Sequence, residues 1–177
     1  MRLIPMLAAM ALAAAPAAAA LAPGAKAPDF TTRGAIAGKV FKLHLADQLK
    51  KGPVVLYFFP AAFTGGCNAE AHAFAEAIDQ FKAAGATVIG MSADTIPTLQ
   101  RFSQEKCAGK FAVASAGPSV VAAYDVDLHH VVNGNNATRR TSYVIGQDGT
   151  ITYVHDDLNA DHHVDLTLEA VRKLRKS

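Results

Sequence analysis

The chain has 177 residues, a formal net charge of +2 and 51% hydrophobic residues. This length suits one domain with a substantial core, and the composition needs no second domain to explain it. Acidic and basic residues are interspersed rather than blocked, which excludes an extended nucleic-acid-binding surface. The basic segment 172–176 is expected to be the solvated last turn of a helix, where cations complement the helix dipole.

Residues 1–20 have the composition of a secretory signal peptide. Arg2 precedes a stretch rich in Leu, Met and Ala, which ends in the small residues Ala18–Ala20. Such a segment is cleaved from the mature protein, so we expect a signal peptide over 1–20 and a single domain over 21–177. A membrane anchor is the alternative, although the stretch is short and alanine-rich for a spanning helix. We therefore expect a soluble protein that is secreted or periplasmic, without stable membrane association.

The predicted elements start with an extended lead-in over 23–29 and short strand or turn pieces over 34–45. Residues 54–59 then form an unbroken apolar and aromatic run, which is typical of a strand covered on both faces. Pro60 ends this run. A helix is expected over 66–84, because apolar residues recur there at helical spacing and a glycine follows.

Cys67 falls in the first turn of that predicted helix. Unpaired backbone N–H groups and the positive end of the helix dipole favour an anion there, and hence the thiolate. A buried structural cysteine is the alternative. Against it, Cys67 follows Gly65 and Gly66, which carry no side-chain cover and let backbone donors approach a ligand. Thr64 adds a hydroxyl that can hydrogen-bond a group held at the sulfur.

The rest of the chain alternates between strands and helices. Strands are predicted over 86–92, 111–115, 141–146 and 150–154, and helices over 95–107, 117–124 and 166–174. The last two strands form a hairpin. This order of elements predicts an α/β sandwich with a central mixed sheet.

The residues around Cys67 resemble the active-site motif of a known family. Pro60, Thr64 and Cys67 follow a hydrophobic strand in the order Pro, three residues, Thr, two residues, Cys, which is similar to the motif of the peroxiredoxins, or AhpC/TSA superfamily. Glu70 and the run 140–145 resemble the bacterioferritin-comigratory, PrxQ-like branch. The resemblance implies a thioredoxin-like α/β/α fold and a thiol-dependent peroxidase that reduces hydrogen peroxide and organic hydroperoxides.

The resemblance also implies a role for each matched residue. Cys67 would be the peroxidatic nucleophile, Thr64 would hydrogen-bond the peroxide, and Pro60 would shield the sulfur. Arg140 would favour the thiolate and polarise the peroxide, and Glu70 would position Arg140 through a charge-assisted pair. A surface salt bridge is the alternative for Arg140, and a favourable interaction with the helix dipole is the alternative for Glu70.

Two details of the pattern bear on these roles. Arg139 is adjacent to Arg140, but alternation along a strand sends the two side chains to opposite faces. Gly65 stands where a proline usually precedes the glycine in this branch, and 61–63 replaces a more charged stretch. Neither departure removes a catalytic group, although both are expected to alter the stiffness of the loop and the peroxides that fit.

A second cysteine is needed if the oxidised Cys67 is to be resolved as an intramolecular disulfide. Many members of the branch carry it five residues after the first, where this chain has His72. Cys107, at the end of the following helix, is our candidate for the resolving cysteine. A buried idle thiol and a permanent structural disulfide are the alternatives. A thioredoxin-like or glutaredoxin-like donor is the expected reductant, with no cofactor, and the expected assembly is a monomer or weak homodimer.

A metal-binding module on the same fold is the second hypothesis. Cys67 and His72 lie at a helix start, and the pairs His129-His130 and His162-His163 lie in expected loops, with His155 between them in sequence. Thiolate and imidazole ligands suit copper or zinc. The hypothesis lacks any C-x-x-C spacing, and five helical residues place Cys67 and His72 on different faces.

Overall fold

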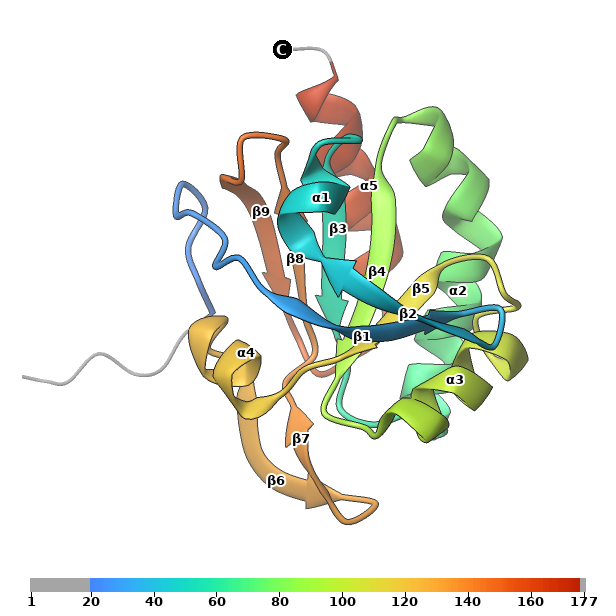
Figure 1. Cartoon of the computed structure of the whole chain (residues 1–177). Helices are drawn as coiled ribbons and strands as arrows, with labels where there is room; N and C mark the ends of the chain where they lie inside the picture. The colour runs from blue at the N-terminus through green and yellow to red at the C-terminus, as the bar shows by residue number, and fades with distance from the viewer. Residues whose placement is uncertain (1–19, 176–177) are drawn as a thin grey trace, which may run out of the picture.

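The computed structural model describes residues 20–175, a sheet with helices on both faces (Figure 1). The strands are β1 (Thr31–Ile36), β2 (Lys39–His44), β3 (Val54–Phe58), β4 (Thr87–Ser92), β5 (Ala112–Ser115), β6 (Asp127–Val132), β7 (Asn135–Thr138), β8 (Thr141–Ile145) and β9 (Ile151–Asp156). The helices are α1 (Leu45–Leu49), α2 (Gly65–Ala83), α3 (Ile96–Glu105), α4 (Pro118–Ala123) and α5 (His163–Leu174). The expected signal peptide lies outside the described residues, except for its last residue. Within 20–175, no helix is long and apolar enough to cross a membrane.

The central sheet is mixed, as predicted. Its strand order is β2-β1-β5-β4-β3-β8-β9, with β3, β4 and β5 parallel to one another and the outer pairings antiparallel. The interior strand β3 pairs Leu56 with Ile89 of β4 on one side and with Tyr143 of β8 on the other. A fully buried interior strand explains the unbroken apolar run.

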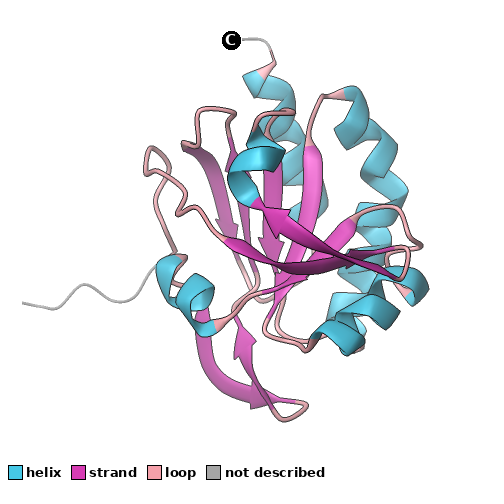
Figure 2. Ribbon diagram, in the orientation of Figure 1, coloured by secondary structure: helices cyan, strands magenta, loops and turns pink. Residues whose placement is uncertain are grey.

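Alternation along β3 divides the core into two layers. Val55, Tyr57 and Phe59 face the layer covered by α2, α3 and α5, whereas Val54 and Leu56 face the layer that includes residues of α1 and α4. Figure 2 shows the helices on either side of the magenta strands. Because side chains alternate between the two faces of a strand, only every second residue of a neighbouring strand can point toward α2.

The structure differs from the sequence predictions at several places, among them the short helix α1, which was not predicted. The hairpin of β6 and β7 was not predicted, and it extends as an arm beyond the sheet in Figure 1. His129 and His130 therefore lie on a strand and not in a loop. The last helix begins at His163 rather than at residue 166, so the second histidine of the pair His162-His163 is helical. His163, the first residue of this helix, is buried among polar groups. A pattern of apolar residues at helical spacing cannot indicate such a position, so the start of the helix was missed.

Candidate active site

Cys67 lies in the first turn of α2, where the chain enters the helix from the end of β3. The backbone amide of Phe59 still donates to the carbonyl of Met91 (2.9 Å), Phe63 takes a left-handed conformation (φ 65°), and the amide of Asn68 donates to the carbonyl of Thr64 (2.9 Å). The Cys67 side chain is 1% exposed. It is as buried as a structural cysteine, but its neighbours include a charged donor.

Arg140 is that donor, and it is also buried. Its Nη2 donates to Cys67 Sγ at 3.6 Å, its Nη1 pairs with Glu70 Oε2, and its Nε donates to the carbonyl of Leu158 at 2.8 Å. Every guanidinium nitrogen therefore has a partner that fixes its direction. The structure brings together the three charged or ionisable groups that the sequence pattern singled out.

Alternation at the start of β8 explains why Arg140 and not Arg139 reaches the sulfur. Arg139 points to the other face, where its Nη2 pairs with Asp156 Oδ2 at 2.6 Å. Thr141, two residues after Arg139 and on the same face, donates to Oδ1 of that carboxylate at 2.8 Å. The prediction that Arg139 and Arg140 point to opposite faces is confirmed.

Glu70 is a buried carboxylate, 1% exposed. Burial raises its pKa to about 7, although Arg140 acts in the opposite direction. A helix-dipole role alone does not account for its contact with Arg140, since a residue that served only the dipole would need no buried partner. The expected pair of Glu70 and Arg140 is present.

Thr64 and Pro60 shape the loop before Cys67. Thr64 Oγ1 donates to the carbonyl of Ala61 at 3.0 Å, and it makes no side-chain cap on α2. The hydroxyl proton is thus directed into the loop, while its lone pairs can accept from a bound hydroperoxide. Pro60 is half-buried at the turn that follows β3.

Asp94 anchors the same loop, and the sequence analysis missed it. Its buried Oδ2 accepts from the amide of Ala62 at 2.7 Å and from Ser92 Oγ at 2.8 Å. Thr138, on β7, donates to the carbonyl of Phe59 at 2.8 Å. A carboxylate two residues after the end of the buried strand β4 is the signal that would have pointed to Asp94.

His163 and Ser142 were also missed as members of the site. His163 is fully buried, with Nδ1 2.8 Å from Ser142 Oγ and 3.7 Å from Glu70 Oε1. Burial lowers the pKa of His163 to about 4. The histidine pair was noted in the sequence as a metal-ligand candidate, but the contact with Glu70 depends on where α5 packs.

Cys107 follows the end of α3 and is fully buried. Both cysteines are free thiols and belong to the same apolar cluster. Burial raises the pKa of Cys107 to about 12, so it is a thiol at neutral pH. Burial also raises the pKa of the neighbouring core residue Tyr57 well above its ordinary value, so its hydroxyl is neutral as well.

The geometry does not support the metal hypothesis. The His72 side chain is 70% exposed, and its Nε2 lies 3.2 Å from Glu76 Oε1 on the outer face of α2. Within residues 20–175, no group of three or more His, Cys, Asp or Glu side chains is arranged to hold a metal ion.

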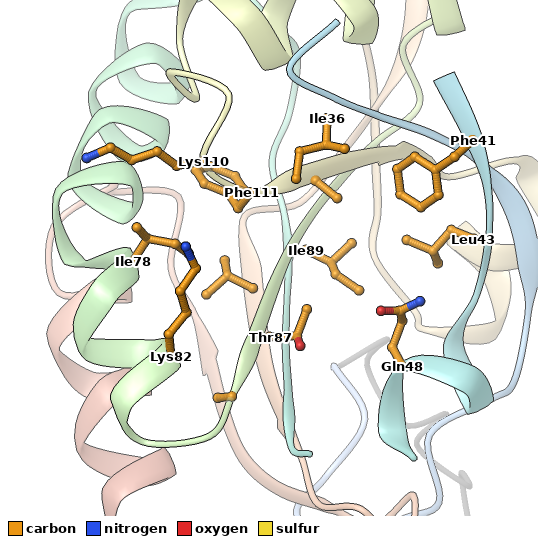
Figure 3. A pocket seen from close by; sticks show the side chains of 13 residues that line it. Ile36, Phe41, Leu43, Gln48, Ile78, Lys82, Thr87, Ile89, Lys110 and Phe111 are labelled. Atoms are coloured by element: carbon orange, nitrogen blue, oxygen red, sulfur yellow. The ribbon is translucent and has the colours of Figure 1, made fainter. Parts of the chain in front are cut away.

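A pocket at the opposite end of α2 contains none of the predicted site residues (Figure 3). It is lined mainly by apolar side chains from β1, β2, α2, β4 and the start of β5, together with Lys82 and Lys110. Lys110 Nζ is already engaged by the carbonyl of Ala75 at 3.0 Å. We therefore assign the chemistry to the Cys67 region and not to this pocket.

Comparison with known proteins gives matches over most of the chain. Residues 23–154 match the model of the AhpC/TSA family. Peroxiredoxin Q, chloroplastic, from Oryza sativa subsp. japonica is 31% identical over 154 residues, which cover 85% of this chain and 67% of the rice protein. A putative peroxiredoxin bcp from Coxiella burnetii is 32% identical over 143 residues, covering 80% and 92%. The crystal structure of peroxidoxin BcpB from Mycobacterium tuberculosis superposes with a TM-score of 0.76 at 28% identity, covering 86% and 97%.

Proposed function

The chain belongs to the AhpC/TSA family and is a thiol-dependent peroxidase of the peroxiredoxin Q type, and we propose that Cys67 is its peroxidatic cysteine. The observation that carries this proposal is the 3.6 Å contact from Arg140 Nη2 to Cys67 Sγ in a buried site. A fixed cation beside the sulfur stabilises the thiolate, which is the nucleophilic form.

The first step forms a sulfur–oxygen bond and breaks the oxygen–oxygen bond of the peroxide. The Cys67 thiolate attacks one peroxide oxygen, the second oxygen departs with the electron pair and takes a proton, and the products are a sulfenic acid and water or an alcohol. Arg140 stabilises the charge on the departing oxygen, and Thr64 accepts a hydrogen bond from the hydroperoxide. Glu70 holds Arg140 in place, and Pro60 shields the sulfur.

The second step is resolution by Cys107. Its sulfur attacks the sulfenic sulfur, a disulfide forms, and the sulfenic oxygen leaves as water. We propose that the end of α3 and the first turn of α2 open in this step, because both sulfurs are buried and the Cys107 thiol must lose its proton to attack. Peroxiredoxins use thioredoxin-like reductants, and we propose that a thioredoxin-like or glutaredoxin-like dithiol re-reduces this disulfide.

Peroxide consumption with dithiothreitol as reductant tests the assignment of Cys67. We expect the reduced wild-type protein to consume hydrogen peroxide catalytically and the variant Cys67→Ser to be inactive. His72→Ala is the matched control, since it changes an exposed side chain on the same helix, and it should retain wild-type turnover. Turnover by Cys67→Ser at the wild-type rate would overturn the assignment.

We also propose that the protein works after export, as a monomer or weak homodimer. The composition of residues 1–20 supports export, because a basic residue precedes an apolar stretch that ends in small residues. Expression of the full chain in a bacterium, followed by fractionation and N-terminal sequencing, tests this. A periplasmic product that begins near Leu21 is the expected result, and a cytoplasmic product that retains Met1 would contradict it.

A further inference from the structure

A pocket of about 250 Å³ opens between α2 and the β1–β2 hairpin (Figure 3). The late start of β5 explains the gap. Pairing between β4 and β5 begins only at Ile89 and Ala112, so within residues 20–175 the preceding β4 residues, Thr87 and Val88, have no partner strand on that side. None of the residues that line the pocket belongs to the proposed peroxidatic site, so the pocket is a separate feature of the fold.

Most of the pocket wall is apolar and continuous with the hydrophobic core. Ile78 from α2, Ile89 from β4 and Phe111, just before β5, line it and are almost fully buried. Ile36, on β1, also lines the pocket, and it is one of the exposed large hydrophobic residues of the protein. An alkyl chain in the pocket would therefore cover apolar surface that is otherwise left in contact with water, which is favourable.

Three hydrogen-bond donors lie at one end of the pocket. Figure 3 shows Thr87, Gln48 and the stem of Lys82 below the rings of Phe111 and Phe41. Lys82 carries an ammonium group, Thr87 a hydroxyl and Gln48 an amide nitrogen, and each of these groups can donate to an anion. The pocket is therefore amphipathic, with a polar end formed by the three donors and an apolar end formed by the aromatic rings.

The fold leaves these donors largely unused. Within residues 20–175, no hydrogen bond engages the Thr87 hydroxyl or the Gln48 amide nitrogen. The Gln48 amide oxygen accepts from Lys51 Nζ at 3.4 Å, which leaves the amide nitrogen for a ligand. Lys82 Nζ lies 3.8 Å from Asp79 Oδ1, and both side chains are well exposed. An exposed pair at this distance contributes little, so a ligand anion can compete for the ammonium group.

The charge of the pocket lining is positive. Among the described residues that line it, Lys82 and Lys110 are charged and none is acidic. Lys110 Nζ donates to the carbonyl of Ala75 at 3.0 Å, but this carbonyl carries no net charge and does not neutralise the lysine. The lining therefore favours an anionic head group over a neutral or cationic one. Because only Lys82 stands beside the two neutral donors, a single negative charge matches the polar end better than a dianion.

We infer that this pocket is a binding site for a short-chain aliphatic carboxylate. The carboxylate group lies at the polar end, where it accepts from Lys82, Thr87 and Gln48. The alkyl chain lies against the apolar wall that includes Ile78 and Ile89. The volume of the pocket is below the roughly 300–1,000 Å³ of sites for drug-sized ligands, which suits a short chain and not a long-chain lipid. The site is independent of the peroxidatic function proposed for Cys67.

An NMR titration of the isoleucine-methyl-labelled protein with octanoate tests the location of the site. Three isoleucines line the pocket and serve as reporters: Ile36, Ile78 and Ile89. Three isoleucines elsewhere in the described residues serve as internal controls: Ile96, Ile145 and Ile151. We expect saturable shifts of the three reporter methyl groups and no shifts of the controls. Reporter methyl groups that do not move, or equal shifts at all six positions, would overturn the proposal.

Two further probes separate carboxylate binding from general hydrophobic binding. Octylammonium has the same chain as octanoate and the opposite charge, so it should bind about tenfold more weakly. Butanoate lacks four of the methylene groups, and it should also bind at least tenfold more weakly, because each buried methylene changes affinity about fourfold. Equal affinity for octanoate and octylammonium would show that the polar end does not select an anion, and this would contradict the proposal.

Lys82→Gln tests the role of the ammonium group. The side chain is exposed, so the variant should fold, and we expect it to bind octanoate about three- to fivefold more weakly than wild type. Lys42→Gln is the matched control. Lys42 lies on β2 between Phe41 and Leu43, which line the pocket, so alternation directs its side chain to the other face. It should bind octanoate as wild type does, and equal losses in the two variants would overturn the assignment of Lys82.

Discussion

In the proposed mechanism, the reactivity of Cys67 depends mainly on the contact between its sulfur and a guanidinium nitrogen of Arg140. Arg140 is held by Glu70 and by the carbonyl of Leu158, so its Nη2 is directed at the sulfur before any peroxide arrives. A charge that is oriented in advance stabilises an anion most strongly in a site that excludes water. Cys67 is buried, and we propose that Arg140 is what makes it reactive.

Replacement of Arg140 by alanine is the sharpest test of that contact. We expect Arg140→Ala to slow the first oxidation of Cys67 by a factor on the order of 10² to 10³, as removal of a donor to developing negative charge does. Stopped-flow mixing of reduced protein with hydrogen peroxide measures this rate. Arg139→Ala is the matched control, since its side chain pairs with Asp156 on the other face, and it should react within about twofold of wild type. Equal loss in both variants would contradict the assignment.

The proposed role of Cys107 predicts a different defect. Cys107→Ser should leave the rate of the first oxidation unchanged, because the hydrogen bonds of Arg140 within residues 20–175 do not involve Cys107. The sulfenic acid of Cys67 should then accumulate and form a mixed disulfide with a thiol supplied in solution. Trapping with a sulfenic-acid reagent and mass spectrometry measures this. If the variant forms a disulfide-bonded, recyclable product as fast as wild type, Cys107 is not the resolving residue.

At the scale of elements, the proposed cycle requires the first turn of α2 to be stable enough to hold Cys67 beside Arg140 and weak enough to open for resolution. Two glycines begin this helix, and glycine disfavours helix by about 0.5–1 kcal/mol relative to alanine. They differ in surroundings. A Cβ on Gly65 would meet nothing within 4 Å, whereas a Cβ on Gly66 would lie 3.2 Å from Arg140 Nη2.

Alanine at these two positions should therefore separate the two chemical steps. Gly65→Ala stabilises the turn, so disulfide formation should slow by about two- to fivefold while the first oxidation is unchanged. Gly66→Ala crowds Arg140 and should slow the first oxidation instead. Stopped-flow measurement of the two phases distinguishes them. A slower first phase in Gly65→Ala would contradict the view that its effect is confined to opening the helix.

The sequence was informative about elements with strong hydrophobic patterns and uninformative where tertiary packing decides. The apolar run of β3, the helical spacing of α2 and the alternation at Arg139 and Arg140 follow from local periodicity, so their positions were predicted. The start of α5 at His163 follows a left-handed residue, His162 (φ 69°), for which the sequence carries no turn signal. The contact of His163 with Glu70 therefore could not be predicted from spacing.

At the scale of the whole molecule, the two buried groups of the site oppose each other in the pH dependence of stability. His163 has a folded pKa of about 4 against an ordinary 6.5, so its contribution to the free energy of unfolding increases with pH between these values. Glu70 has a folded pKa of about 7 against an ordinary 4.5, so the folded state retains a proton that the unfolded state loses, and its contribution decreases as pH rises. The two slopes largely cancel in wild type.

Glu70→Gln should expose this cancellation. Relative to wild type, its free energy of unfolding should rise with pH between about 4.5 and 7, by at most about 1.4 kcal/mol per pH unit. Urea denaturation at several pH values measures the difference. Glu76→Gln, an exposed position on the same helix, is the control and should show no such slope. A constant difference between Glu70→Gln and wild type across this range would contradict the raised pKa of Glu70.

The most direct test of the account is the mass of the reduced protein before and after one equivalent of hydrogen peroxide, with peptide mapping of the product. We expect rapid loss of two hydrogens, mapped to a link between Cys67 and Cys107. In Cys107→Ser we expect the gain of one oxygen on Cys67. Absence of any rapid change at Cys67 would contradict its assignment as the peroxidatic cysteine.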